Sequence, residues 1–323
     1  MNHLSRRGFL HSVGAATIVA TVAGRVAAAQ ETHAAPAAAG QVRFGVQIVP
    51  QHTTYADILQ TMREADELGF DTGFLFDHFI PIMSDPTGPC FEGWTLLSAM
   101  AAQTKRIKVG LLVTGNTYRN PALVAKMAAT VDHVSNGRVI LGLGAAWFES
   151  EHTAYGIPFY TPGERAKRLG EAVEVIKLLL TQPKSSFNGK YYQLKDAPCE
   201  PKPVQKPHLP LLIGGVGPKR IQPLAARHAD IWHFFPASDG DVKSMCEKFD
   251  TLCQQAGRDP AQVEKSMSLR AQHLAGSTEE VRGHVQSFVD AGVRHLIVSL
   301  SPPYDHALMR TFAKEVIPAF RKA

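Results

Sequence analysis

An adjacent carboxylate and imidazole, Asp77 and His78, directly follow the predicted strand 71–76, which ends in Phe74-Leu75-Phe76. An imidazole can donate or accept a proton near neutral pH, which suits general acid–base catalysis. An Asp and a His beside each other also commonly cap loops, and that is the alternative interpretation. His78 and Asp77 are therefore the candidate catalytic residues of this sequence.

A run of small residues forms a second candidate feature. Gly142-Leu143-Gly144-Ala145-Ala146 leaves the backbone uncovered, so that a flat molecule can approach it closely. The run is not a dinucleotide fingerprint, because the third glycine of that motif would fall at Trp147. Trp147 and Glu151, which follow the run, are expected to form part of the wall of a substrate pocket.

A glycine-rich turn, Gly214-Gly215-Val216-Gly217, is predicted to open a helix at Pro218. Lys219 and Arg220 would then lie in the first turn of the helix, where cations are unfavourable unless an anion binds there. Free N–H groups at a helix N-terminus bind phosphate groups well. The turn is therefore a candidate phosphate site.

The composition argues against several other functions. The fourteen histidines include no His-x-His or His-x-x-x-His pair, and the four cysteines form no Cys-x-x-Cys, so no metal site is predicted. The chain has 34 basic and 29 acidic side chains, but Arg6, Arg7 and Arg25 lie in the first 29 residues, which contain no acid. The remainder carries a formal charge of only +2, and no nucleic-acid partner is expected.

Short apolar runs alternate with longer segments of helical periodicity from residue 42 onward, which is typical of parallel βα units. The expected strands span residues 42–48, 71–76, 107–114, 138–143, 209–214, 230–234, 265–271 and 295–300. The expected helices span residues 55–68, 93–103, 122–134, 162–180, 218–227, 240–256, 278–291 and 305–320. Eight consecutive units predict a closed (β/α)8 TIM barrel, with its active site at the carboxyl ends of the strands. An open, doubly wound sheet is the alternative.

The segment 182–208 interrupts this alternation and is predicted to be an insertion in the barrel. Its residues 187–192 have the pattern of a β-hairpin, with a two-residue primed turn at Asn188-Gly189. A proline-rich connection follows the hairpin and leads to the fifth strand.

The first residues have the pattern of an export signal. Ser5-Arg6-Arg7-Gly8-Phe9-Leu10 precedes a mildly apolar run, and Ala27-Ala28-Ala29 offers a cleavage site before Gln30. Residues 1–29 therefore resemble a twin-arginine signal peptide, read by the twin-arginine translocase, and an exported protein of the periplasm or cell envelope is predicted. Residues 30–41 are predicted to be a flexible linker, and 42–323 the barrel domain.

The strand ends taken together resemble the luciferase-like flavin and deazaflavin oxidoreductases, above all the branch that uses coenzyme F420. The similarity runs in order across residues 42–320. It is carried by Arg43-Phe44-Gly45-Val46, Gly69-Phe70-Asp71, Asp77-His78, Val109-Gly110-Leu111-Leu112-Val113-Thr114, Tyr118-Arg119-Asn120-Pro121, Asn136-Gly137-Arg138, Gly142-Leu143-Gly144-Ala145-Ala146-Trp147, Tyr155-Gly156-Ile157, Gly163-Glu164-Arg165 and Ile213-Gly214-Gly215.

The resemblance implies that coenzyme F420, or alternatively FMN, packs its ring on a bulge in the third strand. In this family the bulge contains a non-prolyl cis peptide, which here would be Leu112-Val113. Asp77 would lie near the redox edge of the ring, and His78 would face the substrate. The implied cofactor-binding residues are Asp77, Leu112, Val113, Thr114, Ala145, Ala146, Ile213, Gly214, Gly215 and Val216, and the implied substrate pocket contains Tyr118, Trp147 and Glu151.

The implied activity is that of an F420-dependent dehydrogenase or reductase, which transfers a hydride between the deazaflavin and a small or lipidic substrate. An FMN-dependent monooxygenase that uses O2 has the same fold and is the first alternative. An exported cofactor-binding or carrier protein without turnover, or a barrel hydrolase, is a further alternative. Relatives of this kind lead us to expect a homodimer.

Overall fold

The computed structural model describes residues 41–321, which form a closed barrel of eight parallel strands. The strands pair in the order β3-β2-β1-β11-β10-β9-β8-β5, and the pairing of β3 with β5 closes the ring. Their bounds are β1 Arg43–Ile48, β2 Thr72–Leu75, β3 Lys108–Leu111, β5 Val139–Gly144, β8 Leu211–Gly214, β9 Ile231–Phe234, β10 Glu264–Leu269 and β11 His295–Leu300. The predicted (β/α)8 barrel is confirmed, and the open sheet was the wrong alternative.

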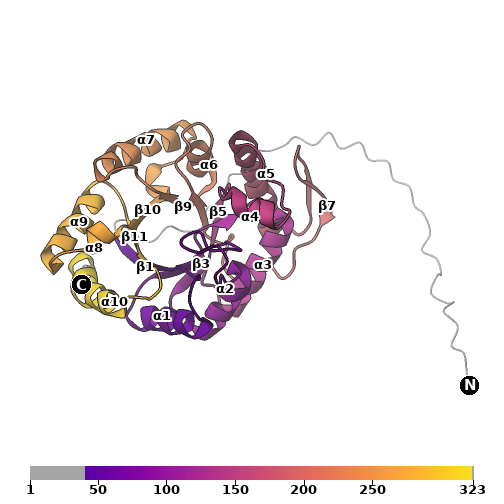
Figure 1. The fold of residues 1–323 in the computed structure, drawn as a ribbon. Helices are drawn as coiled ribbons and strands as arrows, with labels where there is room; N and C mark the ends of the chain where they lie inside the picture. The colour runs from indigo at the N-terminus through magenta and orange to yellow at the C-terminus, as the bar shows by residue number, and fades with distance from the viewer. Residues whose placement is uncertain (1–40, 322–323) are drawn as a thin grey trace, which may run out of the picture. The chain divides into compact units, whose positions relative to one another are not determined.

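Helices surround the strands, as Figure 1 shows in a view down the barrel. The long ones are α1 Tyr55–Glu67, α2 Gly93–Gln103, α3 Pro121–Val134, α5 Pro162–Thr181, α6 Ile221–His228, α7 Val242–Gln255 and α9 Thr278–Asp290. The short ones are α4 Glu149–Ala154, α8 Ala271–Leu274, α10 His306–Thr311 and α11 Ile317–Phe320. The predicted last helix is interrupted, because a π-helical segment, Phe312–Val316, separates α10 from α11.

Local sequence signals explain where several helices begin. The Asn120 side chain accepts a hydrogen bond from the N–H of Ala122, and Pro121 occupies the first turn of α3, where its missing N–H costs nothing. Ser277 and Glu280 form a reciprocal capping box at the start of α9. These caps fix the direction in which each helix leaves the strand end that precedes it.

The hydrophobic core has two parts. The larger part lies between the strands and the surrounding helices and includes Trp94, Trp232 and Phe249. The smaller part fills the inside of the barrel with side chains from alternate positions of the strands. It consists of Phe74, Leu112, Ile140, Leu212, Ile231 and Ile297.

The insertion contains the predicted hairpin, formed by β6 Ser185–Asn188 and β7 Gln193–Ala197, and β7 lies outside the ring of helices (Figure 1). The predicted two-residue primed turn is wrong, because neither Asn188 nor Gly189 has a positive φ and the loop spans residues 189–192. The carboxylate of Glu171 in α5 accepts hydrogen bonds from the N–H groups of three consecutive loop residues, Lys190, Tyr191 and Tyr192. These hydrogen bonds to α5 hold the loop of the hairpin in place of the predicted primed turn.

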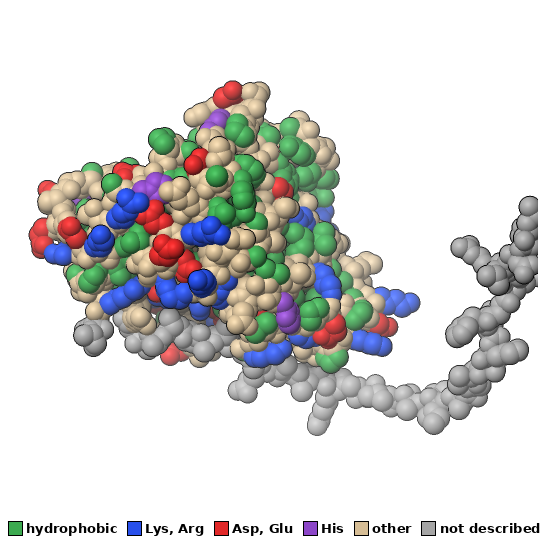
Figure 2. Space-filling view, turned by 90° about the horizontal axis from the view of Figure 1, so that it is seen from below, with side chains coloured by type: hydrophobic (Ala, Val, Ile, Leu, Met, Phe, Trp, Pro, Cys, Tyr) green, Lys and Arg blue, Asp and Glu red, His purple; other side chains and the backbone are tan. Residues whose placement is uncertain are grey.

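Acidic and basic side chains lie intermixed on the face shown in Figure 2. Within residues 41–321, no helix combines the length and the apolar character needed to cross a membrane. The segments 1–29 and 30–41, predicted to be signal and linker, fall outside the described residues, apart from residue 41.

A buried ion pair stabilises the end of the barrel opposite the carboxyl ends of the strands. Nη2 of Arg43 lies 2.5 Å from Oε1 of Glu264, and Nδ1 of His295 lies 3.1 Å from the same oxygen. Burial alone would raise the pKa of Glu264, but Arg43 and His295 outweigh that effect and lower it to about 2. Glu264 therefore stabilises the folded chain as a carboxylate.

The first prediction concerns this ion pair. In the unfolded chain the Glu264 pKa is near 4.5, so its contribution is fully present above that pH and is lost as the pH falls towards 2. We expect Glu264→Gln to lower the free energy of unfolding at pH 7 by about 3 kcal/mol. The difference from the parent protein, measured by urea unfolding, should shrink between pH 4.5 and pH 2. A difference that stays constant over this range would contradict the assignment.

Candidate active site

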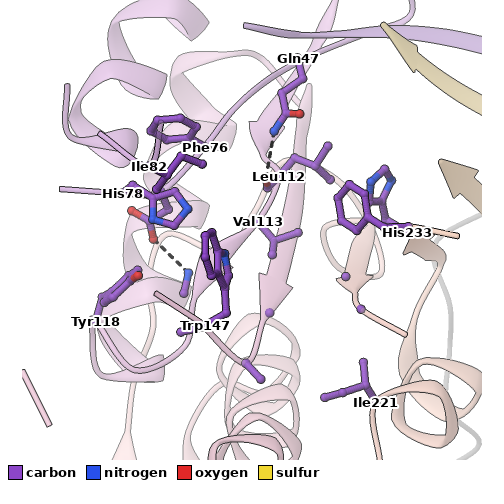
Figure 3. A pocket seen from close by; sticks show the side chains of 18 residues that line it. Gln47, Phe76, His78, Ile82, Leu112, Val113, Tyr118, Trp147, Ile221 and His233 are labelled. Carbon is purple, nitrogen blue, oxygen red and sulfur yellow. Dashed lines mark hydrogen bonds between the residues drawn. The ribbon is translucent and has the colours of Figure 1, made fainter. Parts of the chain in front are cut away.

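A cavity of about 540 Å³ opens at the carboxyl ends of the barrel strands. Figure 3 shows His78, Tyr118 and Trp147 on one side and His233 on the other, with Leu112 and Val113 between them. Ten predicted site residues line the cavity: Asp77, His78, Leu112, Val113, Tyr118, Ala145, Ala146, Trp147, Gly214 and Gly215. The topology of the barrel thus brings together residues from the ends of four barrel strands, β2, β3, β5 and β8.

A buried carboxylate holds the imidazole of His78. Nδ1 of His78 lies 2.6 Å from Oε1 of Glu151, whose side chain is fully buried. Oε2 of Glu151 accepts a hydrogen bond of 2.8 Å from the N–H of Phe79, and the Tyr118 hydroxyl donates to Oε1. Because Nδ1 is engaged with Glu151, Nε2 is the ring nitrogen of His78 that remains for a ligand in the cavity.

Hydrogen bonding sets the charge of Glu151. Burial would raise its pKa, but hydrogen bonds from His78 and Tyr118 and the N–H of Phe79 outweigh burial and lower the pKa. Burial and the nearby carboxylate of Glu151 raise the pKa of the Tyr118 phenol, so Tyr118 stays a hydrogen-bond donor. An ionised Glu151 accepts a hydrogen bond from Nδ1 of His78 and so favours the tautomer of the neutral ring that carries its proton on Nδ1.

The position of Glu151 corrects the prediction that it lines the substrate pocket. It lies behind His78, in the six-residue helix α4, and does not reach the cavity. No helix was expected between residues 143 and 162, because a helix this short has too few turns to show an apolar periodicity. Glu151 is therefore a positioning residue for His78.

Asp77 is engaged in a bidentate ion pair. Its two oxygens lie 2.7 and 3.0 Å from Nη1 and Nη2 of Arg119, and the N–H of Gly115 donates to Oδ2 at 3.1 Å. Burial raises the pKa of Asp77, while Arg119 and the N–H of Gly115 favour the carboxylate. Arg119 also pairs with Glu92, which caps α2. Asp77 therefore anchors two loops around the cavity. Because Asp77 is engaged in this way, His78 is the member of the pair that can exchange a proton with a ligand in the cavity.

The third strand is interrupted as predicted. β3 ends at Leu111, a short strand β4 comprises Thr114–Gly115, and the peptide Leu112-Val113 between them is cis. Side-chain carbons of Val113 fill the space above two glycines: a Cβ at Gly144 would lie 2.5 Å from Val113, and one at Gly214 would lie 3.0 Å from it. These glycines therefore accommodate the bulge, which presents Val113 to the cavity.

Three predicted cofactor residues lie outside the cavity wall. Thr114 and Ile213 are fully buried beneath it, and Val216 is exposed in the loop after β8. Sequence reasoning also missed Gln47, at the end of β1, and His233, in β9. Each is a polar residue within an apolar strand, and this was the signal that could have identified both as facing inward.

A second hollow of about 470 Å³ adjoins the cavity and shares Ala145 and Ile221 with it. We call it the cationic groove, because Arg165, Lys219 and Arg220 line it. The predicted helix start at Pro218 is wrong: α6 begins at Ile221, and residues 218–220 form a turn before it. The carbonyl of Gly217 accepts hydrogen bonds from the N–H groups of Ile221 and Gln222, so these two N–H groups are not available to bind a phosphate.

Arg165 is the most buried of the cations that line this groove. Its guanidinium stacks on Phe159 at 4.1 Å, and Nη1 donates to the carbonyl of Tyr160. Its Nε is buried and has no hydrogen-bond partner. An anion in the groove would meet three cationic side chains, from the start of α5 and from the turn before α6.

Comparison with known proteins shows the family to which this chain belongs. The profile of the luciferase-like monooxygenase family matches residues 39–311, so the chain belongs to that family and is an enzyme. An uncharacterised protein of Mycobacterium tuberculosis is 32% identical over 212 residues, which cover 61% of this chain and 73% of the relative. An F420-dependent glucose-6-phosphate dehydrogenase of Microbacterium testaceum is 28% identical over 87% of this chain and 98% of its own.

Among solved structures, an F420-dependent secondary alcohol dehydrogenase in complex with an F420-acetone adduct superposes with a TM-score of 0.78. The two chains are 24% identical, and the match covers 87% of this chain and all of the other. This similarity shows a shared fold.

The second prediction concerns the packing around the bulge. A Cβ at Gly142 would lie 2.0 Å from the carbonyl oxygen of Leu111, so the backbone itself would have to move. We expect Gly142→Ala to lower the free energy of unfolding by about 1–3 kcal/mol, measured by urea unfolding. Gly283→Ala is the control, because Gly283 lies within α9 with open space around it and should gain about 0.5–1 kcal/mol. Equal effects of the two substitutions would contradict this account of the glycines.

Proposed function

We propose that this enzyme is a coenzyme F420-dependent oxidoreductase that transfers a hydride between the deazaflavin and an organic substrate. The observation that carries the proposal is the imidazole of His78, held by a buried carboxylate at the wall of an apolar cavity. The glucose-6-phosphate dehydrogenase relative, which this chain matches over nearly its whole length, supports F420 as the cofactor.

The residues present fit this cofactor. The apolar surface formed by Leu112, Val113 and Ala145 suits a flat ring system, and the adjoining cationic groove suits its phosphate. Arg165 offers a buried Nε without a partner, which is the group that an anion in the groove would satisfy. Gly214 and Gly215, between the two hollows, would be close to the part of the cofactor that joins ring and phosphate.

The roles of the protein groups follow from their contacts. When bound, the deazaflavin supplies a carbon atom that gives or takes a hydride. When the substrate is reduced, Nε2 of His78 donates a proton to the substrate oxygen. When the substrate is oxidised, Nε2 accepts a proton from that oxygen. Glu151 orients the His78 ring through its contact with Nδ1. The Asp77–Arg119 ion pair holds the residue before His78, and the hydrogen bond from the Phe79 N–H to Glu151 holds the residue after it.

An FMN-dependent monooxygenase is the second candidate. The monooxygenases that give the family its name support it, and the apolar cavity beside the cationic groove suits FMN by the same argument. The two candidate functions differ in the cofactor that the protein is expected to bind more tightly.

The third prediction tests the cofactor. Trp147 lines the cavity, so binding of a ring system there should quench tryptophan fluorescence. We expect F420 to bind much more tightly than FMN when the folded protein is titrated separately with each. A preference for FMN would contradict the proposal in favour of the monooxygenase.

The fourth prediction tests His78 and Glu151. We expect His78→Asn to lower kcat of the F420-linked reaction by about 10²- to 10⁴-fold, because it removes the proton donor. Glu151→Gln keeps the shape of the side chain and removes its charge, so a smaller loss of kcat is expected, roughly tenfold or more. The Kd for F420, measured by fluorescence, should be unchanged in both variants. Unchanged turnover in His78→Asn would contradict the assigned role.

Export by the twin-arginine pathway is part of the proposal. It is supported by Arg6-Arg7 in the sequence, and a cofactor bound in the cytoplasm would require export of the folded protein. The fifth prediction is that replacing Arg6 and Arg7 by lysine keeps the protein in the cytoplasm of a host that has this pathway. Cell fractionation followed by immunoblotting measures the distribution, and undiminished export of the double variant would contradict the assignment.

A further inference from the structure

The cavity wall carries no free charge with which to bind an anionic substrate. None of its 18 lining residues is a lysine or an arginine. Asp77 is the one carboxylate among them, it is 1% exposed, and Arg119 neutralises it. The cations of this region lie instead in the cationic groove, where the proposed cofactor needs them.

The remaining titratable groups of the wall are also engaged. Nδ1 of His233 lies 3.0 Å from Oγ of Ser266, and the ring is completely buried. Burial, with a smaller effect of nearby His295, lowers the pKa of His233 to about 3, so this imidazole is neutral at physiological pH. The Tyr118 hydroxyl donates to Glu151. Among the titratable groups of the wall, Nε2 of His78 is thus the one left to meet a substrate oxygen.

Large apolar side chains stand at opposite sides of the cavity. Trp147 is 60% exposed and its ring lies 5.7 Å from that of His78, measured between centroids. Phe235 is 57% exposed and its ring lies 4.8 Å from that of His233. Figure 3 shows Trp147 and His233 across the cavity from each other. Exposed aromatic surface of this extent around a cavity is typical of a site that binds apolar ligands.

We propose that the substrate is an uncharged, mainly apolar alcohol or carbonyl compound, with its oxygen at Nε2 of His78 and its hydrocarbon part between Trp147 and Phe235. This inference rests on the proposed function and deepens it. It also separates this enzyme from the relative that oxidises a sugar phosphate, because the cavity offers no cation for a phosphate of the substrate.

The reaction balances in either direction. On oxidation, the alcohol O–H bond breaks and its proton passes to Nε2 of His78. The C–H bond of the same carbon would break with its electron pair as a C=O bond forms, and a bound, oxidised deazaflavin would be the two-electron acceptor of that hydride. On reduction, His78 would return the proton to the oxygen, and the hydride for the carbon would come from the reduced cofactor.

The test compares ligands of equal length and different charge. Isothermal calorimetry measures binding of 2-alkanones from butanone to decanone, of decanoate and of glucose 6-phosphate, to the full chain with and without F420. We expect the Kd of the ketones to fall by up to about fourfold for each added methylene until the cavity is filled. In the presence of F420, whose phosphate would occupy the cationic groove, decanoate and glucose 6-phosphate should bind at least 100-fold more weakly than decanone.

Three variants show where the hydrocarbon part binds. Trp147→Ala and Phe235→Ala should each reduce the dependence of Kd on chain length. Leu123→Ala removes another exposed apolar side chain, from α3 and away from the cavity, and should leave the dependence unchanged. Circular dichroism verifies that each variant is folded.

The outcomes separate this inference from the proposed function. A Kd of the ketones independent of length, or anions bound as tightly as decanone, would overturn the substrate class even if F420 binds and is reduced. Failure of F420 to bind would overturn the proposed function. The ketone series on the cofactor-free protein would still decide whether the cavity selects neutral apolar ligands.

Discussion

The hydrogen bond between Glu151 and His78 is the interaction on which the rest of the site depends. A carboxylate with no exposed surface must be satisfied internally, and the imidazole of His78, the Tyr118 hydroxyl and the N–H of Phe79 do so. These donors come from the loops after β2 and β4, while Glu151 comes from α4. The barrel brings all three segments together at one end, and the fixed carboxylate then orients His78 towards the cavity.

A second constraint is the separation of charge beside this site. The cations lie in the groove formed by α5 and the turn before α6, whereas the cavity is apolar and its one carboxylate is paired. Glycines at the ends of β5 and β8 make room for Val113, which lines the apolar cavity, and Ala145 and Ile221 border both hollows. A ligand with a flat ring and an anionic end matches this division, and the ring would shield the reaction at His78 from water.

The sequence was sufficient to predict the barrel, because its eight apolar runs and intervening helical segments repeat regularly. It also placed His78, Asp77 and the cis peptide at Leu112-Val113, through short motifs that resemble a known family. Contacts between distant residues could not be read in this way. Glu151 is 73 residues from His78, Arg119 is 42 from Asp77, and Glu171 determines a hairpin turn about 20 residues away. No local pattern encodes such pairs.

The central claim is that Glu151 fixes the proton of the neutral His78 ring on Nδ1 and leaves Nε2 for the substrate. Nuclear magnetic resonance of protein labelled with ¹⁵N-histidine tests it directly, with the His78 signals identified by their loss in His78→Asn. The account predicts a protonated Nδ1 and an unprotonated Nε2 in the neutral ring, and a loss of this preference in Glu151→Gln. A proton on Nε2 in the parent protein, or an identical spectrum in Glu151→Gln, would contradict it.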